Sequence, residues 1–152
     1  MNKRNSANLV FLLAIVGVFV GLKVYFGRHA EVPAYFDTSR TLHDALAASE
    51  ASGKPVLALV SADWCGPCQG FKRGALSDQD VSRWIAANTE PVYIDVTSPN
   101  NPDAAELGVR SIPAVVLIDE RGELSRVEGA MSASSFLGWA DGALAGGVSS
   151  TD

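Results

Sequence analysis

Cysteine and histidine are both scarce in this chain of 152 residues. The sequence contains two cysteines, Cys65 and Cys68, and two histidines, His29 and His43. So few cysteines exclude a fold held together by several disulfides, and a bridge across three positions closes too small a loop to constrain the unfolded chain much. A closed zinc site needs four ligands, and the two histidines do not stand at a ligand spacing. A structural disulfide and a zinc site are therefore the weaker interpretations of this cysteine pair.

Acidic residues are absent from the first 30 positions. All 17 Asp and Glu residues lie after Ala30, together with 8 of the 12 Lys and Arg residues. That part of the chain therefore carries a net charge of −9, although the whole chain carries −5. So acidic a surface repels phosphate groups, which argues against a nucleic acid as partner. Internal repeats and low-complexity stretches are also absent, and the length suits one domain with additional segments.

The acid-free segment contains a long apolar run. Leu9 to Leu22 includes no charged residue, and residues 24–26 extend the run to 18 positions with Lys23 as the one interruption. As a helix the run would measure about 27 Å, which is enough to cross the hydrocarbon core of a bilayer. We predict a transmembrane anchor over residues 9–26.

Charges beside this run predict its orientation. Lys3 and Arg4 precede it without any acid and favour a cytoplasmic N-terminus over residues 1–8. Lys23 and Arg28 on the other side weaken that signal without reversing it. The rest of the chain then faces a compartment in which disulfides persist. A cleaved signal peptide is the alternative, and we favour the anchor because the run is long for a signal peptide and no small-x-small cleavage site follows it.

The two cysteines belong to a short motif that follows an apolar segment. Residues 55–61 (PVLALVS) have the continuous apolar character of a buried strand, and Trp64-Cys65-Gly66-Pro67-Cys68 comes soon after them. Residues 69–76 can be helical, so unpaired N–H groups and the positive end of the helix dipole face the first sulfur. They favour its thiolate, the reactive form, and Cys68 is placed to attack a mixed disulfide formed at Cys65. The pair is therefore interpreted as a redox dithiol.

Other elements follow from apolar spacing and turn residues. The segment 41–52 begins with Thr41, has Asp44 three positions later and ends before Gly53, as expected of a helix. His43 lies off its apolar face and is interpreted as solvent-exposed. Strands that alternate with helices indicate a parallel sheet, and a terminal hairpin adds antiparallel strands. We predict an α/β fold with a mixed sheet between helices, with strands at 34–36, 55–61, 91–96, 114–118 and 124–127, and helices at 41–52, 69–76, 79–88, 103–107 and 132–144.

The motif Trp64–Cys68, with Ser111-Ile112-Pro113 about 45 residues later, resembles the thioredoxin superfamily. The resemblance covers residues 38–145 and implies the thioredoxin fold, a mixed central sheet flanked by helices. Residues 27–37 would then form a spacer and residues 146–152 a flexible tail. In DsbD-type thiol:disulfide interchange proteins, the C-terminal domain passes electrons from a transmembrane partner to exported disulfide proteins. Similarity to that domain is carried by residues 62–65, 76–78, 95–97 and 107–109.

This resemblance implies roles for individual residues. Cys65 would be the attacking thiolate and Cys68 the resolving thiol. Pro113 would be a cis-proline that faces the dithiol, with Ile112 offering backbone groups to a bound substrate strand; an ordinary trans proline at the start of a strand is the alternative. Trp64 would shield the site and shape its docking surface. The family needs no metal and no cofactor beyond the redox-active disulfide of its two cysteines.

One position departs from the family pattern. Many thioredoxins carry a buried carboxylate six residues before the first cysteine, where it accepts a proton from the resolving thiol, and the residue here is Leu59. Asp63 is near in sequence, but the alternation of side chains along a strand predicts that it lies at the rim of the site. Asp63 and Glu106 are the candidates to modulate the dithiol. The departure weakens the expectation of a fast reductase.

Together these features predict a membrane-anchored thiol–disulfide oxidoreductase that mainly reduces, with its domain on the periplasmic side of the inner (cytoplasmic) membrane. Gly66 and Pro67 between the cysteines, and Ile112 before the proline, are similar to reducing members of the superfamily. Its partners would be disulfide-containing exported proteins and a thiol electron donor in the membrane or the same compartment. Two alternatives stay open: an oxidase or isomerase of folding proteins, and a non-catalytic binding or assembly module on the same fold.

Overall fold

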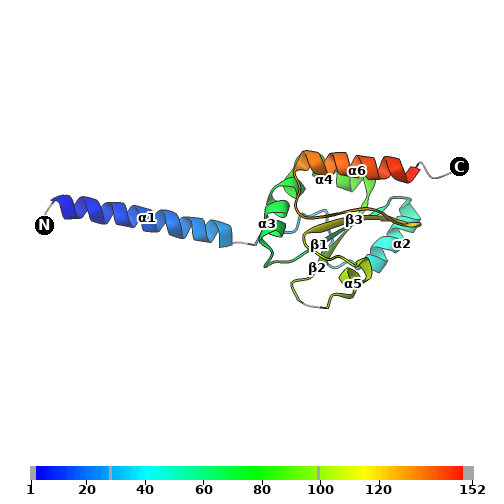
Figure 1. Ribbon diagram of the computed structural model, residues 1–152, viewed down its shortest axis with the longest axis horizontal. Coiled ribbons are helices and arrows are strands. Elements are labelled where there is room, and N and C mark those ends of the chain that lie inside the picture. The colour runs from blue at the N-terminus through cyan, green and yellow to red at the C-terminus, as the bar shows by residue number, and fades with distance from the viewer. Residues whose placement is uncertain (1–2, 28, 99, 149–152) are drawn as a thin grey trace.

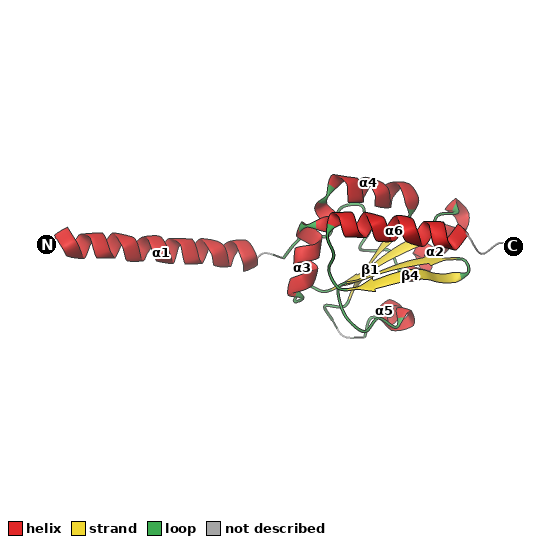
Figure 2. Ribbon diagram, turned by 45° about the horizontal axis from the view of Figure 1, so that its top comes forward, coloured by secondary structure: helices red, strands yellow, loops and turns green. Residues whose placement is uncertain are grey.

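In the computed structural model, which describes residues 3–27, 29–98 and 100–148, a four-stranded sheet lies between two layers of helices (Figures 1 and 2). The strands are β1 (Val56–Ser61), β2 (Glu90–Asp95), β3 (Ala114–Asp119) and β4 (Gly122–Glu128). The helices are α1 (Lys3–Gly27), α2 (Leu42–Ser52), α3 (Gly66–Arg73), α4 (Gln79–Asn88), α5 (Pro102–Leu107) and α6 (Ala133–Val148), with a short 3-10 helix, η1, at Ala75–Ser77.

The sheet is mixed, as predicted. Its strand order is β2-β1-β3-β4, with β1 parallel to β2 and β3 antiparallel to both of its neighbours. The strand predicted at 34–36 is wrong, because that segment turns back on itself. Its turn is closed by the Phe36 N–H, which donates to the Pro33 carbonyl oxygen at 2.9 Å. Directly after the turn, Asp37 forms one isolated parallel bridge with Val92 of β2.

Strand β1 is buried along its whole length. Leu57 and Leu59 pack beneath α3, α4 and α6. The alternate residues of the strand, Val56, Ala58 and Val60, pack beneath α2 and α5. This division follows from the strand itself, in which successive side chains point to opposite faces. The continuous apolar sequence of β1 therefore requires helices on both faces of the sheet, and Figure 2 shows the two layers.

Two helix starts carry the capping residues that their sequences predict. Thr41 caps α2 and forms a reciprocal capping box with Asp44, and Gly53 ends the helix with a φ of 70° that favours glycine. Asp78 caps α4 through side-chain bonds from the Asp80 and Val81 N–H groups. These local signals are sufficient to set where α2 begins and ends and where α4 begins.

The helix after the cysteines is shorter than predicted. The prediction extends it to Leu76, but α3 ends at Arg73 and the chain continues into η1. At Gly74 a Cβ atom would meet the Gly70 carbonyl oxygen at 3.0 Å, so the close turn between the two helices depends on glycine. The break lets Ala75 and Leu76 turn into the core.

The last helix is longer than predicted. The prediction makes residues 146–152 a loose tail, but α6 continues to Val148, and residues 149–152 lie outside the described part of the chain. Glycine lowers helix stability without forbidding a helix. The predicted end at Leu144 therefore gave too much weight to the glycines beyond it.

Helix α1 projects away from the globular body (Figure 1). The predicted anchor, residues 9–26, lies within it, and every side chain that the structure describes from Val10 to Lys23 is exposed. Leu9 and residues 24–26 lie outside the described side chains. Within the described part of the chain, no helix combines the length and the apolar character that crossing a membrane requires. The structure therefore does not support the predicted transmembrane helix.

Candidate functional site

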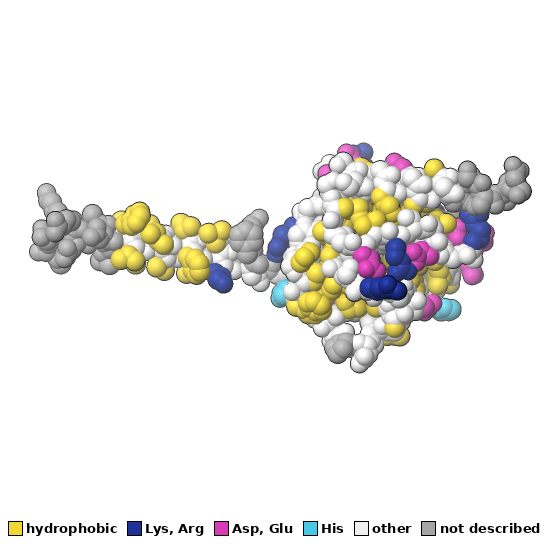
Figure 3. Space-filling model, in the orientation of Figure 1, with side chains coloured by type: hydrophobic (Ala, Val, Ile, Leu, Met, Phe, Trp, Pro, Cys, Tyr) yellow, Lys and Arg dark blue, Asp and Glu magenta, His cyan; other side chains and the backbone are white. Residues whose placement is uncertain are grey.

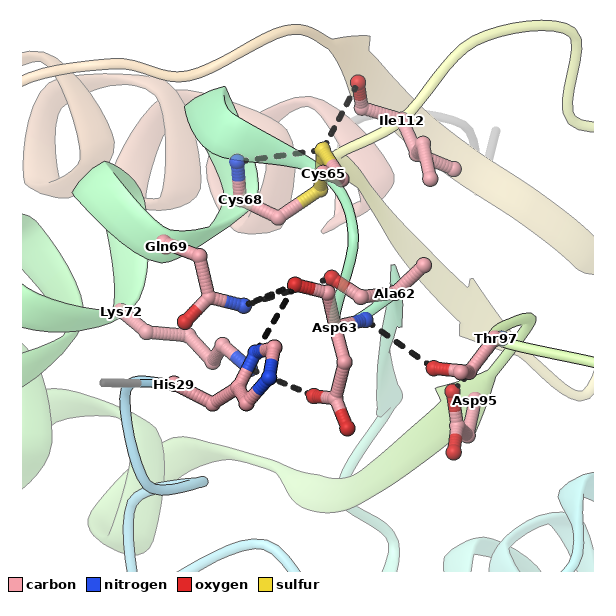
Figure 4. The surroundings of a disulfide bond; sticks show 10 residues. All are labelled: His29, Ala62, Asp63, Cys65, Cys68, Gln69, Lys72, Asp95, Thr97 and Ile112. Atoms are coloured by element: carbon pink, nitrogen blue, oxygen red, sulfur yellow. Dashed lines mark hydrogen bonds and ion pairs between the residues drawn. A yellow bond between two sulfur atoms is a disulfide. The ribbon is translucent and has the colours of Figure 1, made fainter. Parts of the chain in front are cut away.

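The two cysteines lie just beyond the C-terminal end of the central strand β1. Cys65 is the N-cap of α3, and Pro67 occupies its first turn, where a missing N–H costs nothing. Cys65 and Cys68 form a disulfide with their Cα atoms 5.2 Å apart (Figure 4). The structure is thus the oxidised form of the predicted dithiol.

The two sulfurs differ in their surroundings. Cys65 is 5% exposed and Cys68 is 1% exposed, so Cys65 lies nearer to solvent. The Cys68 N–H donates to Cys65 Sγ at 3.2 Å. In the reduced state this donor and the N-terminus of α3 would stabilise a thiolate on Cys65. That Cys65 attacks first stays a prediction, and this geometry is consistent with it.

The Ile112–Pro113 segment faces the disulfide. Its peptide bond is cis, the conformation that the family resemblance implied. The Ile112 carbonyl oxygen lies 3.8 Å from Cys65 Sγ (Figure 4), a contact rather than a hydrogen bond because a disulfide sulfur carries no hydrogen. Ile112 also packs against the small cluster that Ala62 forms with the two cysteines. A segment far away in sequence therefore forms one wall of the site.

Trp64 forms the exposed side of the site. It is 67% exposed, and its indole Nε1 donates to the Thr97 carbonyl oxygen at 3.3 Å. Apolar side chains gather on the part of the globular body next to α1 (Figure 3). A shallow groove beside the dithiol is lined mostly by apolar side chains, including Trp64, Val96 and Ile112, and its polar members are Arg110 and Ser111.

Thr97 fixes the loop that precedes the motif. Its hydroxyl oxygen accepts a hydrogen bond from the Asp63 N–H at 3.0 Å, and its own N–H donates to Asp95 Oδ1 at 2.8 Å. The loop after β2 thus holds the loop after β1. The similarity at residues 95–97 had suggested no role for Thr97, because the bond joins segments 34 residues apart.

Glu128 holds the loop that leads into Ile112 and Pro113. Its carboxylate accepts hydrogen bonds from the Arg110 N–H at 3.1 Å and from the Ser111 hydroxyl at 2.9 Å. These bonds, with the charge of Arg126 as a lesser cause, hold the pKa of Glu128 below its usual range. Glu128 was missed from sequence, because it stands at the end of a hairpin strand 17 residues beyond Ser111.

The predicted spacer, residues 27–37, docks beside the site. His29 Nδ1 donates to the Asp63 carbonyl oxygen at 3.1 Å, and the Ala30 N–H donates to Gln69 Oε1. The Gln69 amide in turn donates to the Asp63 carbonyl oxygen at 3.2 Å (Figure 4). The chain that leaves α1 is therefore attached to the same loop that presents the dithiol.

Leu59 is fully buried beneath the site, in register with Tyr93 of β2. Asp63 lies at the rim with its side chain 49% exposed, as the alternation predicted, and Glu106 is exposed on α5. Lys72 is a buried ionisable group on this side, and its Nζ lies 3.7 Å from Asp63 Oδ1. The sequence held a signal for Lys72, because it follows the buried Cys68 by four residues and shares its helix face.

His43 is exposed on α2, on the far side of the sheet from His29 and the docked spacer. Over residues 3–27, 29–98 and 100–148, no three side chains of His, Cys, Asp or Glu come together as a metal site.

Known proteins resemble this chain over the same region. Residues 42–143 match the family described as the thioredoxin-like domain. The thiol:disulfide interchange protein DsbD of Yersinia enterocolitica is 38% identical over 97 residues, which is 60% of this chain and 17% of that protein. DsbD of Citrobacter koseri is 35% identical over 150 residues, 88% of this chain and 26% of that protein. The chain therefore spans only about a sixth to a quarter of the length of these relatives.

Solved structures give the same result. The oxidised C-terminal domain of DsbD from Neisseria meningitidis is 27% identical, with a TM-score of 0.57 over 70% of this chain and 97% of that one. A thioredoxin from Thermus thermophilus is also 27% identical, with a TM-score of 0.57 over 65% of this chain and 80% of that one. The fold is shared with these proteins.

The Glu128 contacts predict how the loop before the cis-proline responds to mutation and pH. In Glu128→Ala the backbone amides of residues 110–112 should exchange hydrogen faster, measured by mass spectrometry. Since the pKa of Glu128 is lowered in the folded protein, its contribution is complete above the ordinary Glu value of about 4.3 and is lost as the pH falls through the folded value. Glu123→Ala on the same strand is the control, and equal exchange in both variants would contradict the assignment.

Proposed function

The chain belongs to the thioredoxin-like domain family of thiol–disulfide oxidoreductases, and on that premise we propose that it reduces disulfides of exported proteins. The observation that carries this proposal is the Cys65–Cys68 disulfide at the N-terminus of α3, with the Ile112 carbonyl oxygen 3.8 Å from Cys65 Sγ. The similarity to the C-terminal domain of DsbD supports the same class of reaction.

The proposed cycle starts from the reduced dithiol. The Cys65 thiolate attacks one sulfur of a substrate disulfide, forming a mixed disulfide and releasing the first substrate sulfur as a thiolate, which takes up a proton. Cys68 then gives up its proton and attacks Cys65 Sγ. The Cys65–Cys68 bond forms, and the second substrate sulfur leaves as a thiolate. Two electrons and two protons pass to the substrate, and a thiol donor must restore the dithiol.

The walls of the site support a docked substrate chain. Trp64 and Ile112 border the groove beside Cys65, and the backbone at Ile112–Pro113 faces the sulfur that attacks first. An extended substrate segment could pair with that backbone while its apolar side chains enter the groove. Thr97 and Glu128 would act indirectly, by holding the two loops that carry these walls.

We include a membrane anchor at α1 in the proposal. Ten large apolar side chains between Val10 and Leu22 are exposed, each by 48% or more. A helix that is apolar on all sides is stable when protein or lipid surrounds it. The bonds from His29 to Asp63 and from Ala30 to Gln69 of α3 would then place the dithiol on the side of the domain nearest the membrane, within reach of a membrane-embedded thiol donor.

Substitution of each cysteine tests the proposed chemistry. Cys65→Ser should lower the reduction of insulin by dithiothreitol to the uncatalysed rate, because it removes the attacking sulfur. Cys68→Ser should also stop turnover but accumulate a mixed disulfide at Cys65, seen on non-reducing gels and identified by mass spectrometry. A chain that keeps its full biological activity without both cysteines would instead be the binding or assembly module.

The reduction potential tests the direction of electron flow. Equilibration of the purified chain with glutathione should give a value between about −200 and −280 mV, the range of thioredoxins and glutaredoxins. A potential in that range fits a reducing role, because a dithiol passes its electrons to any substrate disulfide whose reduction potential is less negative. A value near −120 mV would assign the chain to oxidation of folding proteins.

Extraction with sodium carbonate tests the anchor. The full chain expressed in bacteria should stay in the membrane pellet, and the double variant Val16→Lys/Val20→Lys should move to the supernatant because lysine at a helix centre costs several kcal/mol in a bilayer. Ala47→Lys/Ala51→Lys on α2 is the matched control. Release of the unaltered chain, or an intact mass that lacks the N-terminal segment, would contradict the anchor and favour a cleaved signal peptide.

A further inference from the structure

Lys72 is an unusual residue in the core of this domain. Its side chain is 1% exposed, and its Nζ has no hydrogen-bond partner among the described residues. Lysine is almost never fully buried unless it is paired, because burial removes the hydration of its charge. So costly a placement suggests a function for the amine, and the reaction described above does not use Lys72.

The charged and titratable groups around Lys72 come from several elements. Asp63 Oδ1, on the loop after β1, lies 3.7 Å from Nζ, and the Tyr93 ring of β2 is centred 5.8 Å from it. Burial raises the pKa of Tyr93, and Asp95 and Asp63 add to that rise. On the side of the docked spacer, His29 contacts the backbone of Asp63. Among these side chains, Lys72 is the buried cation.

Lys72 is also close to the dithiol along α3. It follows Cys68 by four residues, so the two side chains lie on one face of the helix, about 5–6 Å apart at their Cβ atoms. Both are buried. Figure 4 shows Lys72 and Asp63 together on the same side of Gln69, below the disulfide. At the position where the resemblance to thioredoxins implies a buried acid, this chain has Leu59, and α3 contributes a buried amine, Lys72.

We propose that Lys72 is a positioning residue for the reaction, whose buried ammonium stabilises the thiolate of the reduced dithiol while Asp63 limits that effect. This inference rests on the proposed thiol–disulfide exchange and adds the group that tunes it. The physical basis is the weak screening of charges inside a protein. At an effective dielectric constant of about 20, a unit charge some 10 Å away shifts a thiol pKa by on the order of one unit.

The sign of the effect follows from the charges. Loss of the ammonium destabilises the thiolate, so the Cys65 thiol should titrate at higher pH. A less stable reduced form is a stronger reductant, so the potential should become more negative. Loss of the Asp63 carboxylate from a chain that already lacks the ammonium should act in the opposite direction, because it removes a negative charge near the thiolate.

The test compares Lys72→Met with Lys72→Met/Asp63→Asn in the full chain, purified in detergent and reduced. The rate of Cys65 alkylation by iodoacetamide is measured against pH, and the equilibrium with glutathione is measured at pH 7. Lys72→Met should raise the midpoint of alkylation by about one pH unit and shift the glutathione equilibrium by up to about tenfold, near 30 mV more reducing. The double variant should return part of the way to the unaltered chain.

Three controls separate an electrostatic effect of Lys72 from a loss of folding. Lys54→Met, at the other end of β1, should change neither measurement. Lys72→Met should unfold at no lower temperature than the unaltered chain, because the Asp63 left behind is half exposed. If Lys72→Met fails to fold, Lys72→Gln gives the same readout. A folded variant with an unchanged alkylation profile overturns the role of Lys72, whereas a chain that does not exchange with glutathione at all overturns the proposed function.

Discussion

Two layers of helices must cover β1, because all six of its residues are buried. The sheet and the site both depend on this requirement. The alternate residues of β1 anchor two separate apolar clusters, one beneath α3, α4 and α6 and the other beneath α2 and α5. The strand ends with Ser61, Ala62 is still buried, and Asp63 is the first exposed residue after it. A strand held on both faces gives those residues a fixed starting point, and α3 begins soon after it at Gly66.

The local parts of this arrangement could be predicted from sequence. The unbroken apolar character of β1, the capping residues of α2 and α4, and a motif with proline in the first helical turn each act over a few residues. Errors arose where a distant contact or a glycine decided the outcome. The segment 34–36 turns instead of pairing, α3 stops at Gly74 because the chain passes close to the Gly70 carbonyl oxygen, and α6 runs through its glycines.

The walls of the site could be predicted only in part. The motif and the Ile112–Pro113 segment were identified from resemblance, but the groups that hold them were not. Thr97 is joined to Asp63 across 34 residues, and Glu128 to Ser111 across 17. Such bonds depend on sheet register, which places the ends of β2 and β4 beside the loops that they support. No periodic pattern in one sequence encodes them, because the partners are exposed polar residues on loops or at the end of a strand.

The family resemblance and the buried charge near the dithiol lead to different expectations for the reduction potential. Glycine and proline between the cysteines are similar to reducing relatives, which favours a low potential. A buried ammonium acts against that tendency, because it stabilises the thiolate and with it the reduced form. Asp63 lies 3.7 Å from the ammonium and is half exposed, so it offsets the charge incompletely and in a manner that depends on solvent. With Leu59 unable to take a proton, the reactivity of this site depends on the balance between Lys72 and Asp63 instead of on a single buried acid.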